Sequence, residues 1–424
     1  MKRLLFYVMV LCLIGSLVGC TQPIAGKELK SDKQRVSYPD VSQIEIESLV
    51  DGNSAFAFNL YQQLIDNGEN LFYSPYSLSL ALAMTYAGAR GETAQEMANT
   101  LHFYLSQDKL HPAFNWLDIE LAKRGEGAEG KDDEGFRLNI VNAIWGQENY
   151  RFLDDFLDVL AENYGAGLRI LDFIKSTEES RTTINKWVSQ QTEERIEELI
   201  PQGAIDAATR LVLTNAIYFN AAWMYPFDEK NTVDGDFNFL NGDTVIVPMM
   251  SQTELLNYMK GNNYQVVELP YDGNELSMLL IMPDEGSFAS FEQALDNELI
   301  DNILSQLGTK QVVLSMPKFE FRTEVGLKQI LPAMGMPTAF SGMADFSGMT
   351  GNHDLFIGDV LHEAFVSVDE AGTEAAAATA VIMKLTAAEE MVTMSLDHPF
   401  IFLIRDIKTG TVLFVGRVLN PKAE

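Results

Sequence analysis

Apolar residues recur at helical spacing through the first part of the chain. In residues 48–65, SLVDGNSAFAFNLYQQLI, they gather on one side of a helix. Residues 74–89, SPYSLSLALAMTYAGA, begin with Ser74 and Pro75, which are favoured at helix starts, and are apolar on nearly every side. The sequence therefore predicts an amphipathic helix followed by a buried one.

The later part of the chain is dominated by short apolar or alternating runs, which are typical of strands. Clear examples are LVLTNAIYFNAAW at 211–223, QVVLSMPKFEFRTEV at 311–325 and FIFLIRD at 400–406. No long linker and no internal repeat divides these runs from the helical part. The economical prediction is one α+β domain built around large sheets.

The first twenty residues have the pattern of an export signal. Lys2 and Arg3 precede an apolar run, Leu4–Val18, which is too short for an ordinary membrane span and is followed by Gly19. Cys20 comes directly after this small residue and resembles the lipid-bearing cysteine of a lipoprotein signal. A plain signal peptide with an incidental cysteine is the alternative. The sequence thus predicts a signal peptide at 1–19, a polar tether at 20–44 and a folded domain at 45–424.

In the lipoprotein interpretation, a lipid on Cys20 anchors the exported chain to a membrane. The predicted location is the outer face of the cell membrane, the periplasm or the cell surface. The other cysteine, Cys12, would be removed with the signal, so no disulfide is expected to stabilise the exported domain.

Acidic residues outnumber basic residues by two to one. The chain has 60 Asp and Glu against 30 Lys and Arg, a formal net charge of −30. A surface of this kind repels phosphate and sulfate groups. The charge therefore argues against nucleic acid and against a heparin-like cofactor as partners.

The chain carries no recognisable catalytic motif. The patterns G-x-S-x-G, G-x-x-x-x-G-K-[ST], H-E-x-x-H and C-x-x-C do not occur, and His is present only five times. Ser315 and Lys318 match S-x-x-K, but that motif needs a helix start, whereas here it lies inside an alternating strand. We therefore expect no enzyme activity, no metal and no cofactor.

Residues 368–380, VDEAGTEAAAATA, concentrate small side chains in one stretch. An alanine-rich helix is one interpretation, because alanine has the highest helix propensity. Gly372 and two threonines interrupt such a helix, and no apolar stripe is present to dock it. The other interpretation is a strand that enters a sheet, with Glu374 on the outward face, where a charge is tolerated. Small inward side chains avoid overpacking, which favours the strand; they are Thr373, Ala375, Ala377, Thr379 and Val381.

These residues resemble the reactive-loop hinge of the serpins, and further motifs extend the resemblance. SLDHPFIFLIRD at 395–406, followed by TGTVLFVGRVLNP, is similar to the serpin C-terminal signature. NLFYSPYSLSLALAMTYAGARGET at 70–93 is similar to the central buried helix of the family. The resemblance covers residues 45–421. It implies a single-domain α+β fold with three β-sheets, eight or nine helices and an exposed reactive loop in the C-terminal third.

The resemblance also implies a function. Serpins are suicide inhibitors of serine or cysteine proteases: the loop is cleaved, the protease is caught as a covalent acyl-enzyme, and the hinge inserts as a strand into the central sheet. The expected protein is a monomer and not an enzyme. A non-inhibitory serpin that acts as a binding or carrier protein is the alternative. Bulky, charged or proline residues would be expected at its insertion positions, and this hinge has none there.

Position by position, the resemblance assigns roles to three groups of residues. The hinge comprises Glu370, Gly372, Thr373, Glu374, Ala375, Ala376, Ala377, Ala378 and Thr379. At the top of the sheet, the region called the breach, Trp223 and Lys318 match family residues, and the lysine is expected to pair with Glu370. Beneath the centre of the sheet, the region called the shutter, the matching residues are Ser74, Ser77, Asn215 and His362.

The scissile bond is assigned by counting from the hinge. With Glu370 as the first residue, the family spacing places the bond between Thr386 and Ala387. The stretch up to Pro399 is a residue or two longer than in many members, so neighbouring bonds stay open. The alternative residues before the bond are Met383, Lys384 and Leu385.

Overall fold

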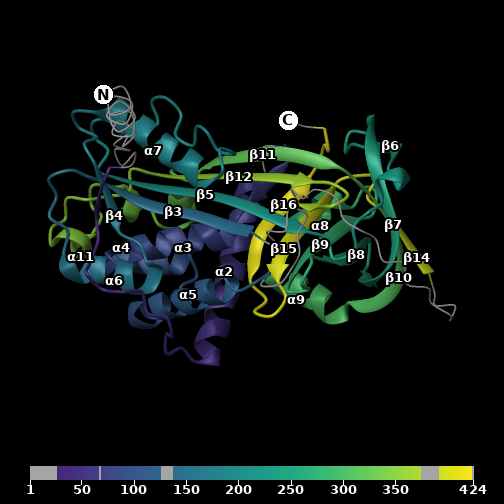
Figure 1. Cartoon of the computed structure of the whole chain (residues 1–424), viewed down its shortest axis with the longest axis horizontal. Coiled ribbons are helices and arrows are strands. Elements are labelled where there is room, and N and C mark those ends of the chain that lie inside the picture. Colours follow the sequence, from purple (N-terminus) through teal and green to yellow (C-terminus); the bar gives the residue numbers. More distant parts are fainter. Residues whose placement is uncertain (1–25, 66–67, 126–136, 374–390, 423–424) are drawn as a thin grey trace, which may run out of the picture.

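The computed structural model describes residues 26–65, 68–125, 137–373 and 391–422. Its described helices lie mainly in the first half of the chain (Figure 1). They are α2 (Gln43–Leu64), α3 (Pro75–Tyr86), α4 (Gly91–Thr100), α5 (Gln107–Leu121), α6 (Asp154–Tyr164), α7 (Thr177–Gln191), α8 (Phe288–Gln293), α9 (Asn297–Gln306), α10 (Ile330–Met334) and α11 (Ser347–Thr350).

Local capping explains where the first helices begin. Ser42 and Glu45 form a capping box at the start of α2, in which the Glu45 carboxylate accepts a hydrogen bond of 2.8 Å from the Ser42 backbone N–H. At α3, the Ser74 hydroxyl accepts from the Ser77 backbone N–H, and Pro75 occupies the first turn. Every residue of α3 is buried, as the sequence predicts.

The first sheet has seven described strands in the order β1-β4-β3-β5-β13-β12-β11. Their bounds are β1 (Lys27–Leu29), β4 (Leu168–Leu171), β3 (Arg137–Gln147), β5 (Leu211–Ala222), β13 (Gly372–Thr373), β12 (Asp359–Val368) and β11 (Phe319–Gly326). At one end, β5 and β12 pair directly and in parallel, from Val212 opposite Asp359 to Ile217 opposite Ala364. At the other end, the two-residue strand β13 lies between them and pairs with both.

The second sheet has nine described strands, with the path β14-β10-β7-β8-β9-β15-β16-β2 and β6 paired to β7. Their bounds are β14 (Met391–Ser395), β10 (Gly308–Pro317), β7 (Thr244–Lys260), β8 (Tyr264–Pro270), β9 (Leu276–Pro283), β15 (Phe400–Asp406), β16 (Val412–Val418), β2 (Leu71–Tyr73) and β6 (Val233–Asn238).

The expected three sheets thus form two hydrogen-bonded systems among the described strands. The long strand β7 pairs with β6 through its first residues and with β8 through its last, so it joins what the family resemblance presents as two separate sheets. The described part also has ten α-helices, slightly more than expected, because several are single turns. The α+β fold class itself is confirmed.

Helices cover the two faces of the first sheet unequally. In Figure 1, α3 and its neighbours lie on one side and α7 lies on the other. On the α7 side, Ile184 and Val188 are buried against the sheet, and Trp187 meets Trp145 edge-on at 5.3 Å between ring centroids. The Arg169 guanidinium lies over both rings, at 4.6 and 5.6 Å. Helix α7 is therefore a surface helix that packs on an apolar face of the first sheet.

The segment before α2 lies along the domain instead of standing free. Its strand β1 pairs antiparallel with β4, with Glu28 opposite Arg169. Arg35 donates to Asn115 (2.7 Å) and Asp118 (2.6 Å) of α5, and Val36 N–H donates to the Glu162 carbonyl of α6 (2.9 Å). Of the predicted tether, residues 26–42 therefore make contacts with the domain, and the residues before Gly26 lie outside the described part.

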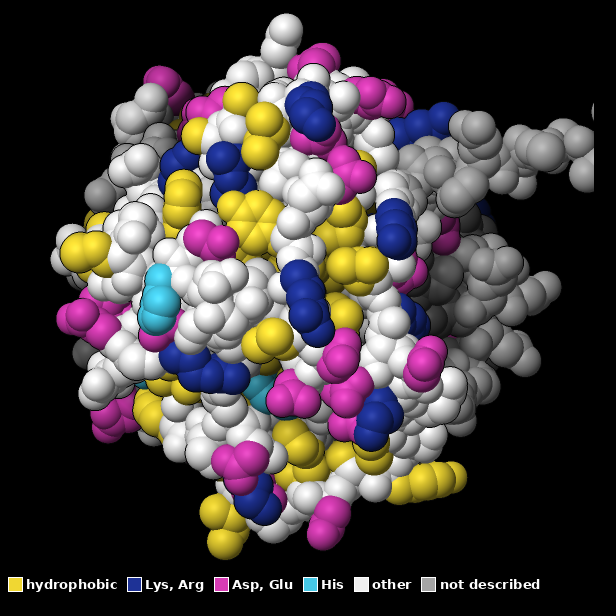
Figure 2. Space-filling model, turned by 90° about the vertical axis from the view of Figure 1, so that its left-hand side faces the viewer, with side chains coloured by type: hydrophobic (Ala, Val, Ile, Leu, Met, Phe, Trp, Pro, Cys, Tyr) yellow, Lys and Arg dark blue, Asp and Glu magenta, His cyan; other side chains and the backbone are white. Residues whose placement is uncertain are grey.

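Two general features of the described residues bear on function. None of their helices combines the length and apolar character needed to cross a membrane. They also hold no group of three or more His, Cys, Asp and Glu side chains arranged to bind a metal ion. Figure 2 shows the end of the molecule with α4, α6 and α11, where Lys and Arg side chains alternate with Asp and Glu and form no continuous basic surface.

Candidate functional site

The shutter residues meet beneath the point where β5 and β12 pair. Asn215 on β5 donates its amide N–H groups to the Ser77 hydroxyl of α3 and the Asn142 side chain of β3. The Asn215 side-chain oxygen faces Nδ1 of His362, which lies directly opposite on β12. The Ser74 backbone N–H donates to Nε2 of His362 over 3.2 Å. The network therefore ties the two central strands to each other and to α3.

The hydrogen-bond partners of His362 define its protonation state. Nε2 accepts from a backbone N–H, so the single ring proton lies on Nδ1 and is donated to Asn215. Burial lowers the pKa of His362 to about 3. The ring is therefore neutral at physiological pH, and acid would have to place a charge in the core.

Glu370 connects the hinge to the top of the first sheet. Its carboxylate accepts from Lys318 Nζ and from the Thr232 hydroxyl, each over 2.7 Å. Its backbone carbonyl accepts from the Phe227 N–H over 2.8 Å. Burial raises the pKa of Glu370, but the hydrogen bonds from Lys318 and Thr232 outweigh it, and the pKa is net lowered. The carboxylate is therefore charged and holds the first hinge residue in place.

Thr373 is the last hinge residue that the structure describes, and it already lies inside the sheet. It pairs with Val368 of β12 on one side and Ala221 of β5 on the other, and it is fully buried. Its hydroxyl forms a 2.8 Å hydrogen bond with the Tyr271 hydroxyl. The Thr373 side chain therefore faces the core, as the alternation of small inward residues predicts for a strand that begins here.

Trp223 secures the same corner of the sheet. Its indole N–H donates to the Asp369 carbonyl (3.0 Å) and its backbone N–H donates to the Ala371 carbonyl (2.8 Å). Its ring stacks on Tyr271 with 4.6 Å between centroids and an interplanar angle of 12°. Trp223 and Tyr271 together form an aromatic support for residues 369–373, where the hinge begins.

Gly372 is required by the space available between the strands. A Cβ at this position would lie 2.2 Å from the Ala221 carbonyl oxygen, a backbone atom that has no room to move. Any larger residue would therefore push β13 away from β5. The hinge glycine is explained by close backbone approach rather than by flexibility alone.

The remaining predicted site residues lie outside the described part of the chain. These are the hinge residues Glu374, Ala375, Ala376, Ala377, Ala378 and Thr379, the candidate scissile residues Met383, Lys384, Leu385, Thr386 and Ala387, and the lipid-attachment candidate Cys20.

The structure adds three residues that the sequence did not single out: Tyr271, Thr232 and Asn142. Each contacts a predicted site residue, yet each lies far from it in the sequence. Tyr271 follows the strand run YQVVELP, and its position between Pro270 and a turn gives no sign of a role. Only the spatial pairing of β5, β12 and β13 reveals these contacts.

The geometry defines a sheet whose two central strands are held apart at one end and pair directly at the other. The first hinge residues lie between β5 and β12 as β13, and Asn215 and His362 of the shutter network lie opposite each other within the stretch where these strands pair directly. A family model described as Serpin (serine protease inhibitor) matches residues 51–421, and the chain belongs to this family.

Individual relatives agree with this assignment. The chain is 42% identical to an uncharacterized serpin-like protein of Thermococcus kodakarensis over 88% of this chain and 86% of the relative. It is 40% identical to a leukocyte elastase inhibitor of Xenopus laevis, over 89% of this chain and all of that protein. The crystal structure of the thermophilic serpin tengpin in its native state superposes with a TM-score of 0.80 at 30% identity, covering 92% of this chain and 97% of tengpin.

Proposed function

We propose that this protein is a suicide inhibitor of proteases that acts by inserting its cleaved loop as a new strand between β5 and β12. The observation that carries the proposal is the position of Gly372 and Thr373, which already occupy the first two places of that strand. The side chains around them, Lys318, Glu370, Thr232 and Tyr271, are engaged in hydrogen bonds that fix the hinge, which supports a structural role for them and assigns the chemistry to the captured protease.

The register indicates how far insertion would run. Thr373 faces Ala221, so continuing the pairing would place residue 374 opposite Asn220 and residue 383 opposite Leu211, the first residue of β5. Each added residue gains backbone hydrogen bonds worth about 0.5–1.5 kcal/mol. The insertion of about ten residues would therefore release far more than the few kcal/mol held by the shutter hydrogen bonds. The native sheet is expected to be metastable with respect to its cleaved form.

The target is proposed to be a serine protease of elastase-like specificity. Thr386 and Ala387 are small residues at the counted bond, and the similarity to a leukocyte elastase inhibitor supports the same class. Trypsin-like enzymes would instead require Lys384, and chymotrypsin-like enzymes would require Leu385 or Met383. Cysteine proteases remain a further candidate class for the same loop.

A protease panel tests this proposal. The protein is incubated with elastase-, trypsin-, chymotrypsin-, subtilisin- and papain-like proteases and then analysed on denaturing gels. A complex that survives boiling in detergent is expected with the elastase-like enzyme, and mass spectrometry of the released peptide identifies the bond. Rapid cleavage without a stable complex for every protease would contradict inhibition and favour the carrier alternative.

The second part of the proposal concerns location: an exported protein anchored through lipid on Cys20. It is supported by the basic start, the apolar run and the small residue before the cysteine. Cys20→Ser should move the protein from the membrane fraction to the soluble fraction. Cys12→Ser is the matched control and should leave the anchoring unchanged. Equal membrane retention of both variants would contradict the lipid anchor.

A further inference from the structure

His398 lies in the short connection between β14 and β15, residues Leu396–Pro399. Its Nδ1 is 2.7 Å from the Asp397 carboxylate, and its Nε2 is 2.8 Å from the Pro283 carbonyl at the end of β9. The side chain is 17% exposed. The ring therefore joins the β14–β15 connection to the neighbouring strand through both of its nitrogens.

Both of these acceptors lack a proton to give. A carbonyl and a carboxylate only accept hydrogen bonds, so both ring nitrogens must donate, and only the imidazolium carries two N–H groups. A neutral ring would direct a lone pair at one of the two oxygens. The hydrogen bond to Asp397 raises the pKa of His398 against the effect of burial, and the Pro283 carbonyl and the charge of Glu285 act in the same direction.

The β14–β15 connection adds hydrogen bonds to the strand pairing that attaches β14 to the rest of the molecule. Leu396 N–H donates to the Ser315 carbonyl of β10 over 2.8 Å. The backbone N–H and the side-chain amide of Asn238 on β6 donate to the Asp397 carbonyl, over 2.8 and 3.3 Å. Among the described strands, β14 itself pairs only with β10, through five residue pairs. The hydrogen bonds of the connection therefore supplement a single line of strand pairing.

The number of residues between β13 and β14 determines whether an uncleaved loop can insert fully while β14 stays paired with β10. Seventeen residues, 374–390, separate β13 from β14. If residues 374–383 filled the strand position beside β5, residues 384–390 would have to return from its far end. Seven residues span at most about 25 Å, whereas a strand of ten residues is about 33 Å long. Full insertion without cleavage therefore requires β14 to leave β10.

We propose that the His398 imidazolium is a pH-sensitive clamp that holds β14 in place and so restrains insertion of the uncleaved loop. The clamp weakens as the ring loses its proton, because one of the two hydrogen bonds is then lost. The consequence for insertion rests on the function proposed above, whereas the clamp itself is a property of the described residues.

The direction of the pH effect follows from linkage. A histidine whose pKa is raised on folding stabilises the folded connection fully below its unfolded pKa, which is about 6.5. That contribution is lost as the pH rises through the folded value. The connection is thus most stable in mild acid and loosens on the alkaline side of pH 6.5.

Hydrogen exchange at the Leu396 and Asn238 amides, corrected for the intrinsic effect of pH, tests the clamp directly. Between pH 6 and pH 9, protection in the unmodified protein should fall about tenfold for each unit by which folding raises the pKa of His398. His398→Lys keeps a positive charge throughout and should show flat protection. His398→Gln is neutral throughout and should be weakly protected at every pH. Equal pH profiles in the unmodified protein and His398→Lys would overturn the clamp.

Two further measurements keep the test decisive if a position-398 variant folds poorly. NMR titration of the His398 ring in the unmodified protein should give a pKa above 6.5, and Asp397→Asn should lower it. A ring pKa at or below 6.5 would overturn the proposal. Insertion of the uncleaved loop is followed separately by native gels. If hydrogen exchange changes with pH as predicted but no insertion occurs at pH 9, the clamp is supported and the proposed function is contradicted.

Discussion

At the scale of single residues, the central strand β12 carries two buried ionisable side chains that face opposite sides of the sheet. His362 faces α3 and stays neutral in the shutter network. Glu363, its neighbour, is 1% exposed and has Arg322 at 3.1 Å, but the ion pair is imperfectly aligned and one carboxylate oxygen lacks a hydrogen bond among the described atoms. Strand β12, which borders the proposed insertion position, therefore carries an electrostatically unfavourable carboxylate at its centre.

Glu363→Gln should stabilise the native state at alkaline pH. Burial raises the pKa of Glu363 to about 7, with the Arg322 charge opposing and the Glu324 charge adding to the effect. The folded chain keeps a proton that the unfolded chain releases near pH 4.5, so stability falls as the pH rises from 4.5 to 7 and is lowest above it. In urea unfolding at pH 8, the variant should gain up to about 3 kcal/mol.

The matched control is Glu320→Gln, which removes an exposed carboxylate from the neighbouring strand β11. This variant should change the free energy of unfolding by less than about 0.5 kcal/mol both at pH 5 and at pH 8. If Glu363→Gln and Glu320→Gln show the same difference between pH 5 and pH 8, the strain assigned to Glu363 is absent.

At the scale of elements, β1 extends the edge of the first sheet beyond β4, and the residues after it bind α5 and α6. Gly167 permits this close approach, because a Cβ there would lie 2.7 Å from the Leu29 carbonyl oxygen. The edge of β4 is thereby paired, so that the sheet ends in a strand of only three residues with a correspondingly short row of unpaired backbone groups. Residues 27–36 are therefore a structural part of the domain.

Arg35→Ala should destabilise the domain by about 1–2 kcal/mol, because it removes two hydrogen bonds to α5, one of them to the Asp118 carboxylate. Lys33→Ala is the control: Lys33 is more exposed and lies 3.5 Å from Glu162, so its loss should cost less than about 0.5 kcal/mol. Urea unfolding compares the two. Equal losses in both variants would mean that the segment contributes nothing specific.

The sequence predicted the elements whose signals are local. The cap at Ser74, the buried helix α3 and the inward phase of Thr373 follow from residue type and period within a few positions. The attachment of β1 does not, because its three residues, two charged and one apolar, are too few to show a hydrophobic period and gain their stability from a distant strand. Tyr271 and Thr232 were missed for the same reason: their roles depend on contacts across more than 100 residues of chain.

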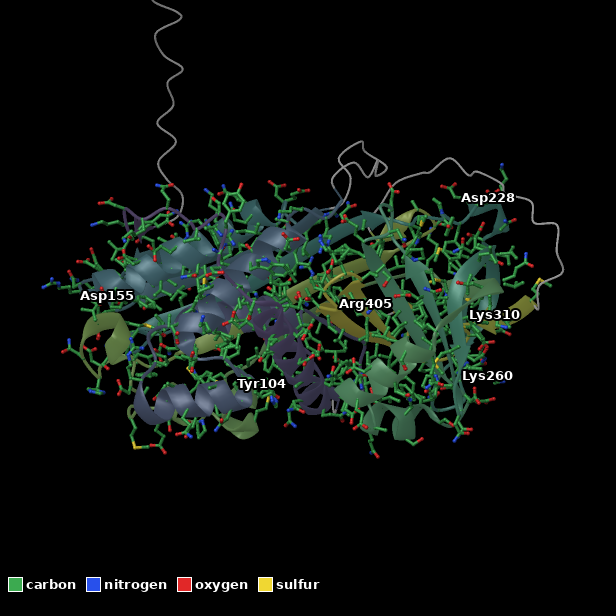
Figure 3. All side chains as sticks on the ribbon, turned by 90° about the horizontal axis from the view of Figure 1, so that it is seen from below. Tyr104, Asp155, Asp228, Lys260, Lys310 and Arg405 are labelled. Carbon is green, nitrogen blue, oxygen red and sulfur yellow. The ribbon has the colours of Figure 1, made fainter. Side chains whose placement is uncertain are left out.

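At the scale of the whole molecule, the first hinge residues and the N-terminal strand β1 lie toward opposite ends of the first sheet. Figure 3 places Asp155 of α6 at one end and Asp228 and Lys310 at the other, where β6, β7, β10 and β14 gather. The hinge enters the first sheet toward this second end, and β1 joins the sheet beside the opposite ends of β3 and β5. Insertion would therefore convert a local cleavage into a change along most of the sheet.

The central claim is that cleavage of the loop allows a strand to enter between β5 and β12. Thr373→Arg would place a long, charged side chain at a fully buried position, displace β13 from between β5 and β12 and so prevent the residues that follow from entering there. Ser305→Arg adds the same side chain at an exposed position of α9 and is the control.

Thermal unfolding before and after cleavage of the loop by a non-target protease tests this claim most directly. After cleavage, Tm should rise by at least about 10 °C for the unmodified protein and for Ser305→Arg, because about ten new strand residues are added. No rise is expected for cleaved Thr373→Arg. An unchanged or lower Tm after cleavage of the unmodified protein would contradict strand insertion.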